Sequence, residues 1–277
     1  MKLIGIKQPH GAGVAVALVV DSRAFVLAEK AMFWSDPQRY LEAANNTDPA
    51  AGLALDSVTE VPLVPDTARV LCIGLNYHAH ANEGGFTVPE YPTIFGRWTA
   101  SLSVGEVAVP VPDNEPGLDW EGEIAAFVGT PLTDADPDTA RKSVLGYSTF
   151  NDLTARTAQK LTAQWTLGKN GDKSGPMGPL ITADEVGDLR EGLHLQTRVN
   201  GTVVQDASTT EMIFDIGQVL SLISRTMTLN PGDVVATGTP EGVGYVRKPA
   251  WLLNDGDVVE VEVDKLGVLR TPIGGVR

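Results

Sequence analysis

Short apolar runs separated by Gly, Pro, Asn and Asp dominate the chain from about residue 67 onward. Four of them are rich in β-branched residues and span 122–129, 193–200, 233–237 and 258–263. Runs of this length, bounded by turn residues, predict β-strands. Asn200-Gly201 predicts a two-residue hairpin turn, since both residues tolerate the positive φ that such a turn demands.

Helical periodicity is confined to a few segments of this larger part. In 214–227 the apolar residues Ile216, Val219, Leu220 and Ile223 recur at helical spacing, which predicts a helix. No repeat of the solenoid type is present. We therefore expect a mainly β (α+β) fold.

The first 66 residues show a different pattern. They contain a β-like run at 13–20 and a segment around Asp36-Pro37 where a helix is predicted to begin. Pro62 and Pro65 then disfavour regular structure. We predict a small N-terminal α/β domain over residues 1–66 and a larger catalytic domain over residues 67–277.

Composition and charge narrow the class of partner. Hydrophobic residues make up 43% of the 277 residues, which is enough for a full core. The formal net charge of −14 argues against a nucleic-acid partner, because phosphate binding needs a dense cationic surface. An anionic small substrate is still compatible with this charge, since a bound cation and a few local Lys or Arg residues can reverse the potential inside one pocket.

The cysteine content and the first residues bear on location. The single cysteine, Cys72, excludes an internal disulfide and a thiolate metal cage, and it lies in an apolar run typical of a buried strand. The first residues show no basic segment leading into an apolar core, and no stretch reaches the roughly 18 apolar residues of a membrane helix. We expect a cytoplasmic protein without a membrane partner.

Three carboxylates alternate along one of the predicted strands. Asp119, Glu121 and Glu123 precede or open the run 124–128, and alternate side chains of a strand share a face. Like charges so close together are unfavourable unless water or a hard divalent cation neutralises them. The spacing is consistent with a metal site and also with an ordinary solvated strand face.

Asp152 follows the apolar run 144–147, where a strand is expected to end and a helical turn to begin. By itself, an Asp in this position is typical of a helix N-cap. Only the fold could bring it next to Glu121.

His80 and Glu83 form a candidate general base. They are three residues apart, so on a helical turn their side chains would meet, and a carboxylate beside an imidazole orients it and raises its basicity. Gly84-Gly85 would suit a hinge for a mobile lid. His78 is the alternative base, and an exposed histidine without function is the alternative interpretation.

Two glycine-rich segments contain further polar candidates. Lys169 lies in the segment 168–173, and Thr239 lies in the segment 237–244. Glycine-rich loops let backbone N–H groups approach an anionic ligand, and a lysine can pair with a carboxylate or a developing enolate. Gly242-Val243-Gly244 lacks the strand-then-helix setting of a dinucleotide fingerprint, so it is interpreted as a turn.

Taken in order, these segments resemble the fumarylacetoacetate hydrolase (FAH) family, specifically its acylpyruvate hydrolase and 2-hydroxyhepta-diene-dioate isomerase branch. The resemblance runs from about Val70 to Leu269. It rests on Gly-Leu-Asn-Tyr-x-x-His at 74–80, Asp-x-Glu-x-Glu at 119–123, Asn-Asp-x-Thr-Ala-Arg at 151–156, Gly-Lys at 168–169, Gly-Pro at 178–179, Asn-Gly at 200–201 and Pro-Gly-Asp-Val-x-x-Thr-Gly-Thr-Pro-x-Gly-Val-Gly at 231–244.

The resemblance implies a mixed β-sandwich roll, a homodimer and a bound Mg²⁺ or Mn²⁺, with Ca²⁺ as a substitute ion in crystals. It assigns the metal ligands to Glu121, Glu123 and Asp152. It assigns the water-activating pair to His80 and Glu83 on a lid. The remaining assignments are a catalytic role for Lys169 and substrate contacts for Arg156, Gln159, Thr239, Gly238 and Tyr77.

The activity implied is hydrolysis of a carbon–carbon bond in a small 2,4-dioxo acid, an acylpyruvate-like substrate, in catabolism. Decarboxylation of an oxaloacetate-like acid or keto–enol isomerisation is the alternative on the same scaffold, and a non-catalytic ligand-binding protein is the third hypothesis. Two departures lie beside the expected pocket: Thr157 stands where many members have Asp, and 170–176 reads Asn-Gly-Asp-Lys-Ser-Gly-Pro where Ser-x-Asp-x-Phe-x-Pro is frequent. The substrate therefore cannot be transferred from any one member.

Overall fold

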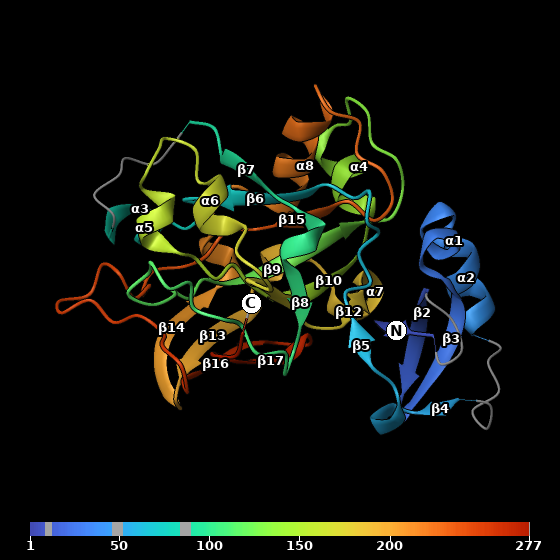
Figure 1. The fold of residues 1–277 in the computed structure, drawn as a ribbon. Helices are drawn as coiled ribbons and strands as arrows, with labels where there is room; N and C mark the ends of the chain where they lie inside the picture. The colour runs from blue at the N-terminus through green and yellow to red at the C-terminus, as the bar shows by residue number, and fades with distance from the viewer. Residues whose placement is uncertain (9–12, 46–51, 84–89, 277) are drawn as a thin grey trace.

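Two β-sheets form the framework of the computed structural model, which describes residues 1–8, 13–45, 52–83 and 90–276 (Figure 1). The larger sheet is mixed and follows the order β4-β3-β2-β1-β12-β10-β9-β15-β6-β7, with β5, β8 and β11 attached beside this path. Its strands are β1 (Lys2–Lys7), β2 (Val14–Val20), β3 (Arg23–Glu29), β4 (Leu53–Ala54), β5 (Glu60–Val61), β6 (Val70–Gly74), β7 (Thr93–Arg97), β8 (Leu102–Val104), β9 (Gly122–Val128), β10 (Val144–Asn151), β11 (Gly175–Met177), β12 (Leu180–Thr182) and β15 (Val234–Ala236).

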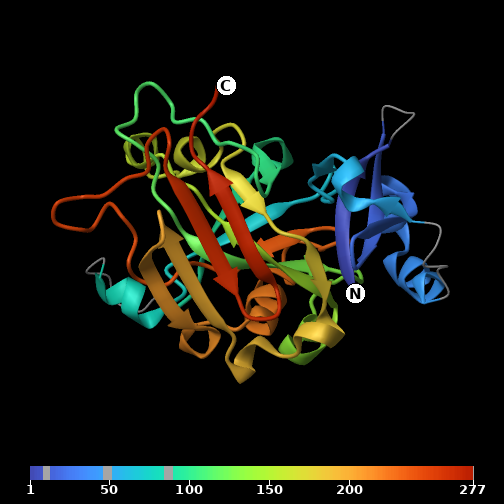
Figure 2. The same ribbon diagram turned by 90° about the horizontal axis from the view of Figure 1, so that it is seen from below.

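The smaller sheet is antiparallel and has the order β14-β13-β16-β17. Its strands are β13 (His194–Val199), β14 (Thr202–Ser208), β16 (Val258–Val263) and β17 (Gly267–Pro272). Figure 2 shows the red strands β16 and β17 crossing the green strands of the larger sheet. Apolar side chains from both sheets, among them Ile124, Leu195 and Val261, share one buried cluster, as expected for a sandwich.

The helices are short and lie around the sheets. They are α1 (Lys30–Ser35), α2 (Pro37–Ala44), α3 (His78–Glu83), α4 (Pro137–Lys142), α5 (Arg156–Gln159), α6 (Thr166–Lys169), α7 (Ala183–Val186) and α8 (Ile216–Ser224). Helix α8 begins with a capping box between Asp215 and Gln218 and buries the apolar face expected for 214–227. No helix in the described part of the chain has the length and apolarity needed to cross a bilayer.

The strands expected from the apolar runs are confirmed. The runs at 13–20, 122–129, 193–200, 233–237 and 258–263 correspond to β2, β9, β13, β15 and β16. The hairpin turn between β13 and β14 has φ of 49° at Asn200 and 79° at Gly201. The helix near Asp36-Pro37 is α2, whereas α1 was not expected.

The N-terminal strands continue the larger sheet. β1 pairs with β12 through Lys2↔Ile181 and Leu3↔Leu180. Figure 1 shows this blue part of the chain at one side of the molecule. The sheet is therefore continuous across the expected boundary at residue 66, and the division into two domains stays a prediction.

Candidate metal and active site

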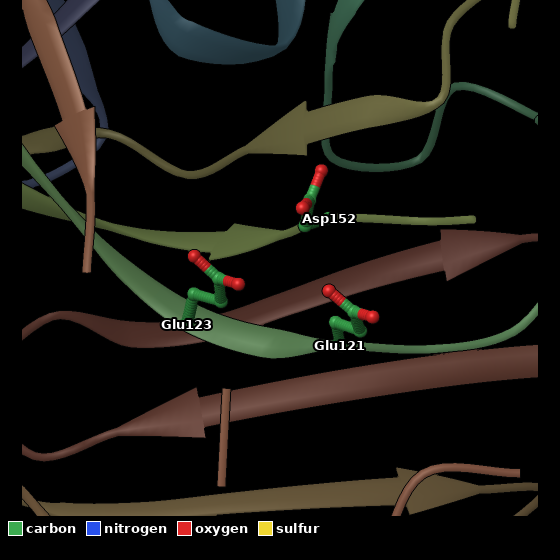
Figure 3. Close-up of side chains that lie close together, drawn as sticks. All are labelled: Glu121, Glu123 and Asp152. Atoms are coloured by element: carbon green, nitrogen blue, oxygen red, sulfur yellow. The ribbon is translucent and has the colours of Figure 1, made fainter. Parts of the chain in front are cut away.

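Three buried carboxylates meet where two central strands end. Glu121 immediately precedes β9, Glu123 lies in β9, and Asp152 immediately follows the antiparallel neighbour β10. The Asp152 N–H donates to the Glu121 carbonyl at 2.9 Å, which keeps the end of β10 beside the start of β9. One oxygen from each carboxylate lies within 4.8 Å of the others (Figure 3). The fold thus brings Asp152 to Glu121, and Asp152 does not cap a helix, since Ala155 precedes α5.

Asp119 does not belong to this group, although it shares the alternating pattern. Its carboxylate accepts hydrogen bonds from the backbone of Gly244 and Tyr245 and from Arg156. The expectation that all three alternate carboxylates would gather at one point is therefore wrong for Asp119. The residue instead holds the loop that follows β15 against α5.

Three cations surround the carboxylate cluster. Lys169 Nζ lies 2.6 Å from both Glu121 and Asp152. Arg156 lies 2.7 Å from Glu121 in an ion pair without hydrogen-bond geometry, and Arg97 donates to Asp152. Each of these cations is buried. Short contacts of this kind offset the desolvation of buried charge.

The surroundings shift the pKa values of Glu121 and Glu123 in opposite directions. Burial raises the pKa of Glu121, but Lys169 and Arg156 outweigh burial and lower this pKa to about 2. Burial and the repulsion of Asp152 and Glu121 raise the pKa of Glu123 well above its usual value. Burial lowers the pKa of Lys169, yet the attraction of Asp152 and Glu121 dominates and raises it.

The carboxylate cluster fits a hard divalent cation. Its donors are all carboxylate oxygens, which Mg²⁺ and Mn²⁺ prefer. Within the described residues, the only hydrogen bond to the Glu123 carboxylate comes from the Gly238 N–H at 3.0 Å, and no cation lies within ion-pair distance of this buried group. A divalent ion held by Glu121, Glu123 and Asp152 would supply a compensating positive charge.

His80 and Glu83 lie together on α3, as expected. The distance from His80 Nδ1 to Glu83 Oε2 is 3.4 Å. Glu83 also accepts from the Gly242 N–H at 3.2 Å. A carboxylate at Nδ1 leaves Nε2 free to accept a proton. The proposed hinge at Gly84-Gly85 lies outside the described residues.

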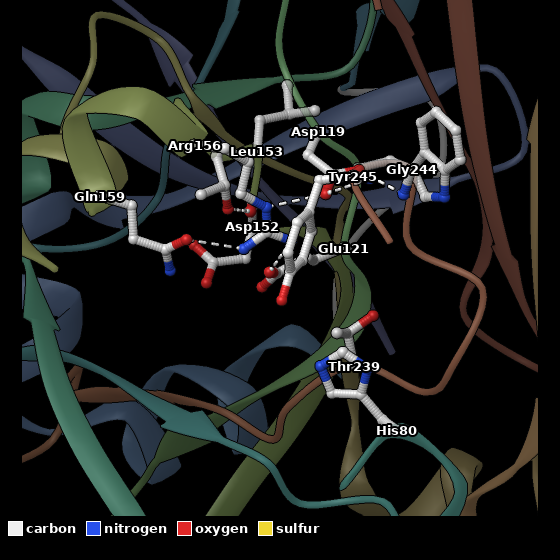
Figure 4. Close-up of polar contacts among 12 residues, drawn as sticks. His80, Asp119, Glu121, Asp152, Leu153, Arg156, Gln159, Thr239, Gly244 and Tyr245 are labelled. Carbon is white, nitrogen blue, oxygen red and sulfur yellow. Dashed lines mark hydrogen bonds and ion pairs between the residues drawn. The ribbon is translucent and has the colours of Figure 1, made fainter. Parts of the chain in front are cut away.

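A cavity of about 500 Å³ opens over the cluster. His80, Arg156 and Thr239 line it (Figure 4), and Ile73, Phe95 and Trp165 form an apolar wall. The site residues expected from the sequence that line the cavity are His80, Glu121, Glu123, Arg156, Gln159, Lys169 and Thr239. Those that do not line it are Tyr77, Glu83, Asp152 and Gly238. His78 is exposed and points elsewhere.

Tyr77 and Gly238 lie behind the cluster. Tyr77 is fully buried, and its hydroxyl has no hydrogen-bond partner in the described structure. Burial, together with the negative charge of Glu123, raises the pKa of Tyr77. Gly238, with φ of 95°, donates to Glu123 from its backbone. Neither residue lines the cavity.

Gln205 is a site residue that the sequence did not indicate. Its Oε1 accepts from the Gly122 N–H at 3.0 Å, and its Nε2 donates to Thr239 Oγ1 at 2.8 Å. Thr239 in turn donates to the Gly122 carbonyl at 3.0 Å. Because Gly122 separates Glu121 from Glu123, this closed ring of hydrogen bonds ties the two carboxylates to Thr239. An added Cβ at Gly122 would lie 2.2 Å from Thr197 Oγ1, so only glycine fits there.

The fold and site together define a class: a mixed β-sandwich protein with a carboxylate cluster, a lysine and a His–Glu pair around one cavity. Residues 69–274 match the model of the fumarylacetoacetate (FAA) hydrolase C-terminal family. The chain therefore belongs to the fumarylacetoacetate hydrolase family, and its fold is the mixed β-sandwich roll expected from the sequence.

Named relatives of this chain carry out more than one reaction. Oxaloacetate tautomerase fahd2 of Xenopus laevis is 35% identical over 248 residues, which cover 85% of this chain and 77% of the relative. The 2,4-didehydro-3-deoxy-L-rhamnonate hydrolase of a Sphingomonas strain is 39% identical over 213 residues, covering 76% and 74% of the two chains. Family membership alone therefore does not choose between hydrolase and tautomerase.

Solved structures agree with the fold. Fumarylacetoacetate hydrolase from Exiguobacterium antarcticum is 30% identical, with a TM-score of 0.82 and full coverage of both chains. Fumarylpyruvate hydrolase from Pseudomonas aeruginosa, in complex with Mn²⁺ and pyruvate, is 30% identical, with a TM-score of 0.69 and coverage of 78% of this chain and 91% of that one.

Proposed function

We propose that this protein is a metal-dependent hydrolase that cleaves a carbon–carbon bond in a small 2,4-dioxo acid. The observation that carries the proposal is the orientation of His80 by Glu83 at a cavity that Glu121, Glu123 and Lys169 also line. A relative named as a sugar-acid hydrolase and a fumarylpyruvate hydrolase structure with Mn²⁺ and pyruvate support this proposal.

The proposed chemistry divides the work among the residues. Mg²⁺ or Mn²⁺, held by Glu121, Glu123 and Asp152, would supply Lewis-acid stabilisation of negative charge on the oxygens of a 2-oxo acid. His80, oriented by Glu83, removes a proton from water, and the water oxygen bonds to the carbonyl carbon C4. The C3–C4 bond then breaks, leaving a carboxylic acid and the enolate of a 2-oxo acid, which takes up a proton at C3.

Lys169 and its neighbours position the negative charge. The Lys169 ammonium is fully buried beside Glu121 and Asp152, where it can stabilise an enolate oxygen more strongly than in water. Arg156, Gln159 and Thr239 line the cavity and are proposed to contact the substrate. Tyr77 and Gly238 are proposed to act through Glu123, because they do not line the cavity.

A second candidate is keto–enol tautomerisation or decarboxylation of an oxaloacetate-like acid. The observation in its favour is that relatives from Xenopus laevis and Bacillus subtilis, at 35% and 34% identity, are named oxaloacetate tautomerases. Both reactions pass through an enolate and need no attacking water. The same carboxylate cluster and Lys169 would therefore serve them.

Product analysis separates the candidates. The purified protein is assayed with acylpyruvates and oxaloacetate, with Mg²⁺ or Mn²⁺ and with chelator. Hydrolysis gives a carboxylic acid and a 2-oxo acid, decarboxylation gives CO₂, and tautomerisation changes only the enol absorbance. Loss of all turnover across this panel would contradict both candidates and favour a non-catalytic binding protein.

His80→Ala tests the assigned base. The expected loss in kcat is roughly 10²- to 10⁴-fold, the usual contribution of general-base catalysis, with metal affinity retained. His78→Ala, two residues away on the same helix but outside the cavity, is the matched control. Full activity of His80→Ala would remove His80 from the mechanism.

The expected homodimer is tested separately by size-exclusion chromatography with light scattering, which measures the molar mass of the protein in solution.

A further inference from the structure

Lys160 lines the cavity and lies against Tyr245. Its Nζ is 4.4 Å from the centroid of the Tyr245 ring, and the Arg156 guanidinium carbon is 4.3 Å from the same centroid. Lys160 directly follows α5, which begins with Arg156. Figure 4 shows Tyr245 beside Arg156 and Glu121. The Tyr245 ring therefore lies against two cations, Arg156 beside the carboxylate cluster and Lys160.

The two cations on this ring differ in their ionic partners. Arg156 is compensated by Asp119 and Glu121. No described carboxylate lies within ion-pair distance of the Lys160 ammonium. Glu83, the other acid near the cavity, is bonded to His80 and to the Gly242 N–H. Lys160 is exposed, lines the cavity and has no ion-pair partner among the described carboxylates.

Charge balance indicates what this cation could bind. The connected ion-pair network contains four carboxylates, Asp119, Glu121, Glu123 and Asp152, and three cations, Arg97, Arg156 and Lys169. With a divalent ion and the single carboxylate of a 2-oxo acid, this network is electrically neutral. Lys160 lies outside this network, and one further anionic group on the ligand would give its ammonium the ion-pair partner that no described carboxylate provides.

The cavity that Lys160 lines is apolar on one side. Ile73, Phe95 and Trp165 form this wall. An aliphatic or unsaturated chain can lie there while each end of the ligand meets positive charge.

We propose that the site selects 2-oxo acids that carry a second carboxylate at the far end of the chain, and that Lys160, supported by the Tyr245 ring, recognises this carboxylate. The inference rests on the proposed function only in taking a 2-oxo acid as the ligand. Lys160 is a specificity-determining residue in this proposal and takes no part in the bond cleavage.

Matched ligand pairs test the proposal without turnover. Pairs of equal chain length are 2-oxopentanoate with 2-oxopentanedioate, and 2-oxohexanoate with 2-oxohexanedioate. Dissociation constants for the full-length Mn²⁺-loaded protein are measured by calorimetry. We expect the dicarboxylate of at least one pair to bind about tenfold more tightly than its monocarboxylate, which corresponds to about 1.4 kcal/mol. In Lys160→Gln this ratio should fall to about one, and in Lys160→Glu below one.

Lys142→Gln is the matched control, because Lys142 is exposed on α4 and does not line the cavity. Equal affinities within both pairs for the unaltered protein, a preference that survives in Lys160→Gln, or failure of every ligand to bind would overturn the proposal. The readout is independent of catalysis. Tight, Lys160-dependent binding without cleavage of any dioxo acid would therefore uphold this inference while refuting the proposed hydrolase.

Discussion

Glu123 and Glu121 are two residues apart, but their surroundings shift their pKa values in opposite directions. Glu121 contacts Lys169 and Arg156, and these cations hold its pKa near 2. Glu123 is equally buried, has no cation in contact within the described structure, and has a raised pKa. The folded state of the metal-free protein therefore holds the Glu123 proton more tightly than the unfolded state does. As the pH rises from the usual pKa of a glutamate toward the raised pKa of Glu123, the free energy of unfolding decreases.

Glu123→Gln should stabilise the metal-free protein and weaken metal binding. Glutamine keeps the shape and the bond from Gly238, but removes the repulsion of Glu121 and Asp152. We expect the melting temperature at pH 7 to rise, by roughly 2–4 °C for each kcal/mol gained, and Mn²⁺ affinity to fall at least about tenfold. Differential scanning calorimetry and Mn²⁺ titration measure both effects.

Glu121→Gln is the control of opposite sign. It removes one of the two carboxylates that each of Lys169 and Arg156 contacts, and the loss of one partner from a buried ion pair destabilises a protein by several kcal/mol. We expect its melting temperature to fall, while Mn²⁺ affinity also decreases. A Glu123→Gln variant that melts below the unaltered protein, or whose gain in stability shrinks as the pH rises from 5 to 7, would contradict this account.

Local motifs made some site residues predictable and left others hidden. Alternation along an extended chain predicted that Glu121 and Glu123 share a face, and helical spacing predicted the contact of His80 with Glu83. Arg97 and Gln205 gave no such signal. Their partners, Asp152 and Gly122, are 55 and 83 residues away in the sequence, so only the completed sheets bring them together.

At the scale of elements, an irregularity in the hairpin β13–β14 delivers Gln205 to the site. The register pairs Val203 with Arg198 and Gln205 with Thr197, which leaves Val204 as an extra residue. A bulge of this kind bends the strand and changes the direction of its side chains. Consecutive Val204 and Gln205 are therefore both buried, where regular alternation would expose one of them.

Gln205→Met tests this role for β14. Gln205 accepts from the Gly122 N–H and also donates to the Pro240 carbonyl at 3.0 Å. Methionine fills a similar volume but leaves both groups without this partner, at a cost of about 1–3 kcal/mol for each unsatisfied group. We expect a lower melting temperature and, because Glu121, Glu123 and Thr239 lose their common support, about a tenfold weaker Mn²⁺ affinity and a raised KM.

Gln196→Met on the neighbouring strand β13 is the control, since Gln196 bonds to exposed Asp206 and not to the site. Partial recovery of Mn²⁺ affinity in Gln205→Glu, which keeps the acceptor for Gly122, would separate positioning from loss of packing. Unchanged Mn²⁺ affinity and KM in Gln205→Met would contradict the role.

Long apolar runs predicted the strands well, whereas the short helices beside the site were not predictable. Helices α5 and α6 have four residues each and no room for an apolar repeat. They exist because tertiary contacts hold them, for example Glu115, which accepts from the N–H groups of Thr157 and Ala158. Periodicity cannot report such contacts.

On the scale of the whole molecule, the N-terminal part and the site-bearing sheet share one core. Trp34 of α1 stacks on Phe127 of β9 at a centroid distance of 6.1 Å and donates to the Leu63 carbonyl at 2.7 Å. Leu3 and Leu180 belong to the same apolar cluster. Although the sequence pattern changes near residue 66, residues on both sides of that boundary bury their apolar side chains in the same core.

Trp34→Ala tests whether residues 1–66 unfold alone. Removing a buried tryptophan costs about 3–5 kcal/mol. Because the core is shared, we expect one cooperative calorimetric transition at a lower temperature. Trp98→Ala is the control, since Trp98 is 61% exposed, and it should shift the transition little. Two separate transitions in the Trp34→Ala variant would instead show that residues 1–66 form an independent domain.

The position of Lys169 bears on the stability of the protein without a bound metal ion. The Lys169 ammonium contacts Glu121 and Asp152 at 2.6 Å, so we expect the protein to stay folded when divalent metal is scarce. Binding and release of the divalent ion would then be reversible and would not require folding or unfolding of the chain. We therefore expect turnover to follow the surrounding concentration of free Mg²⁺ or Mn²⁺, with protein depleted by chelator recovering fully once the ion returns.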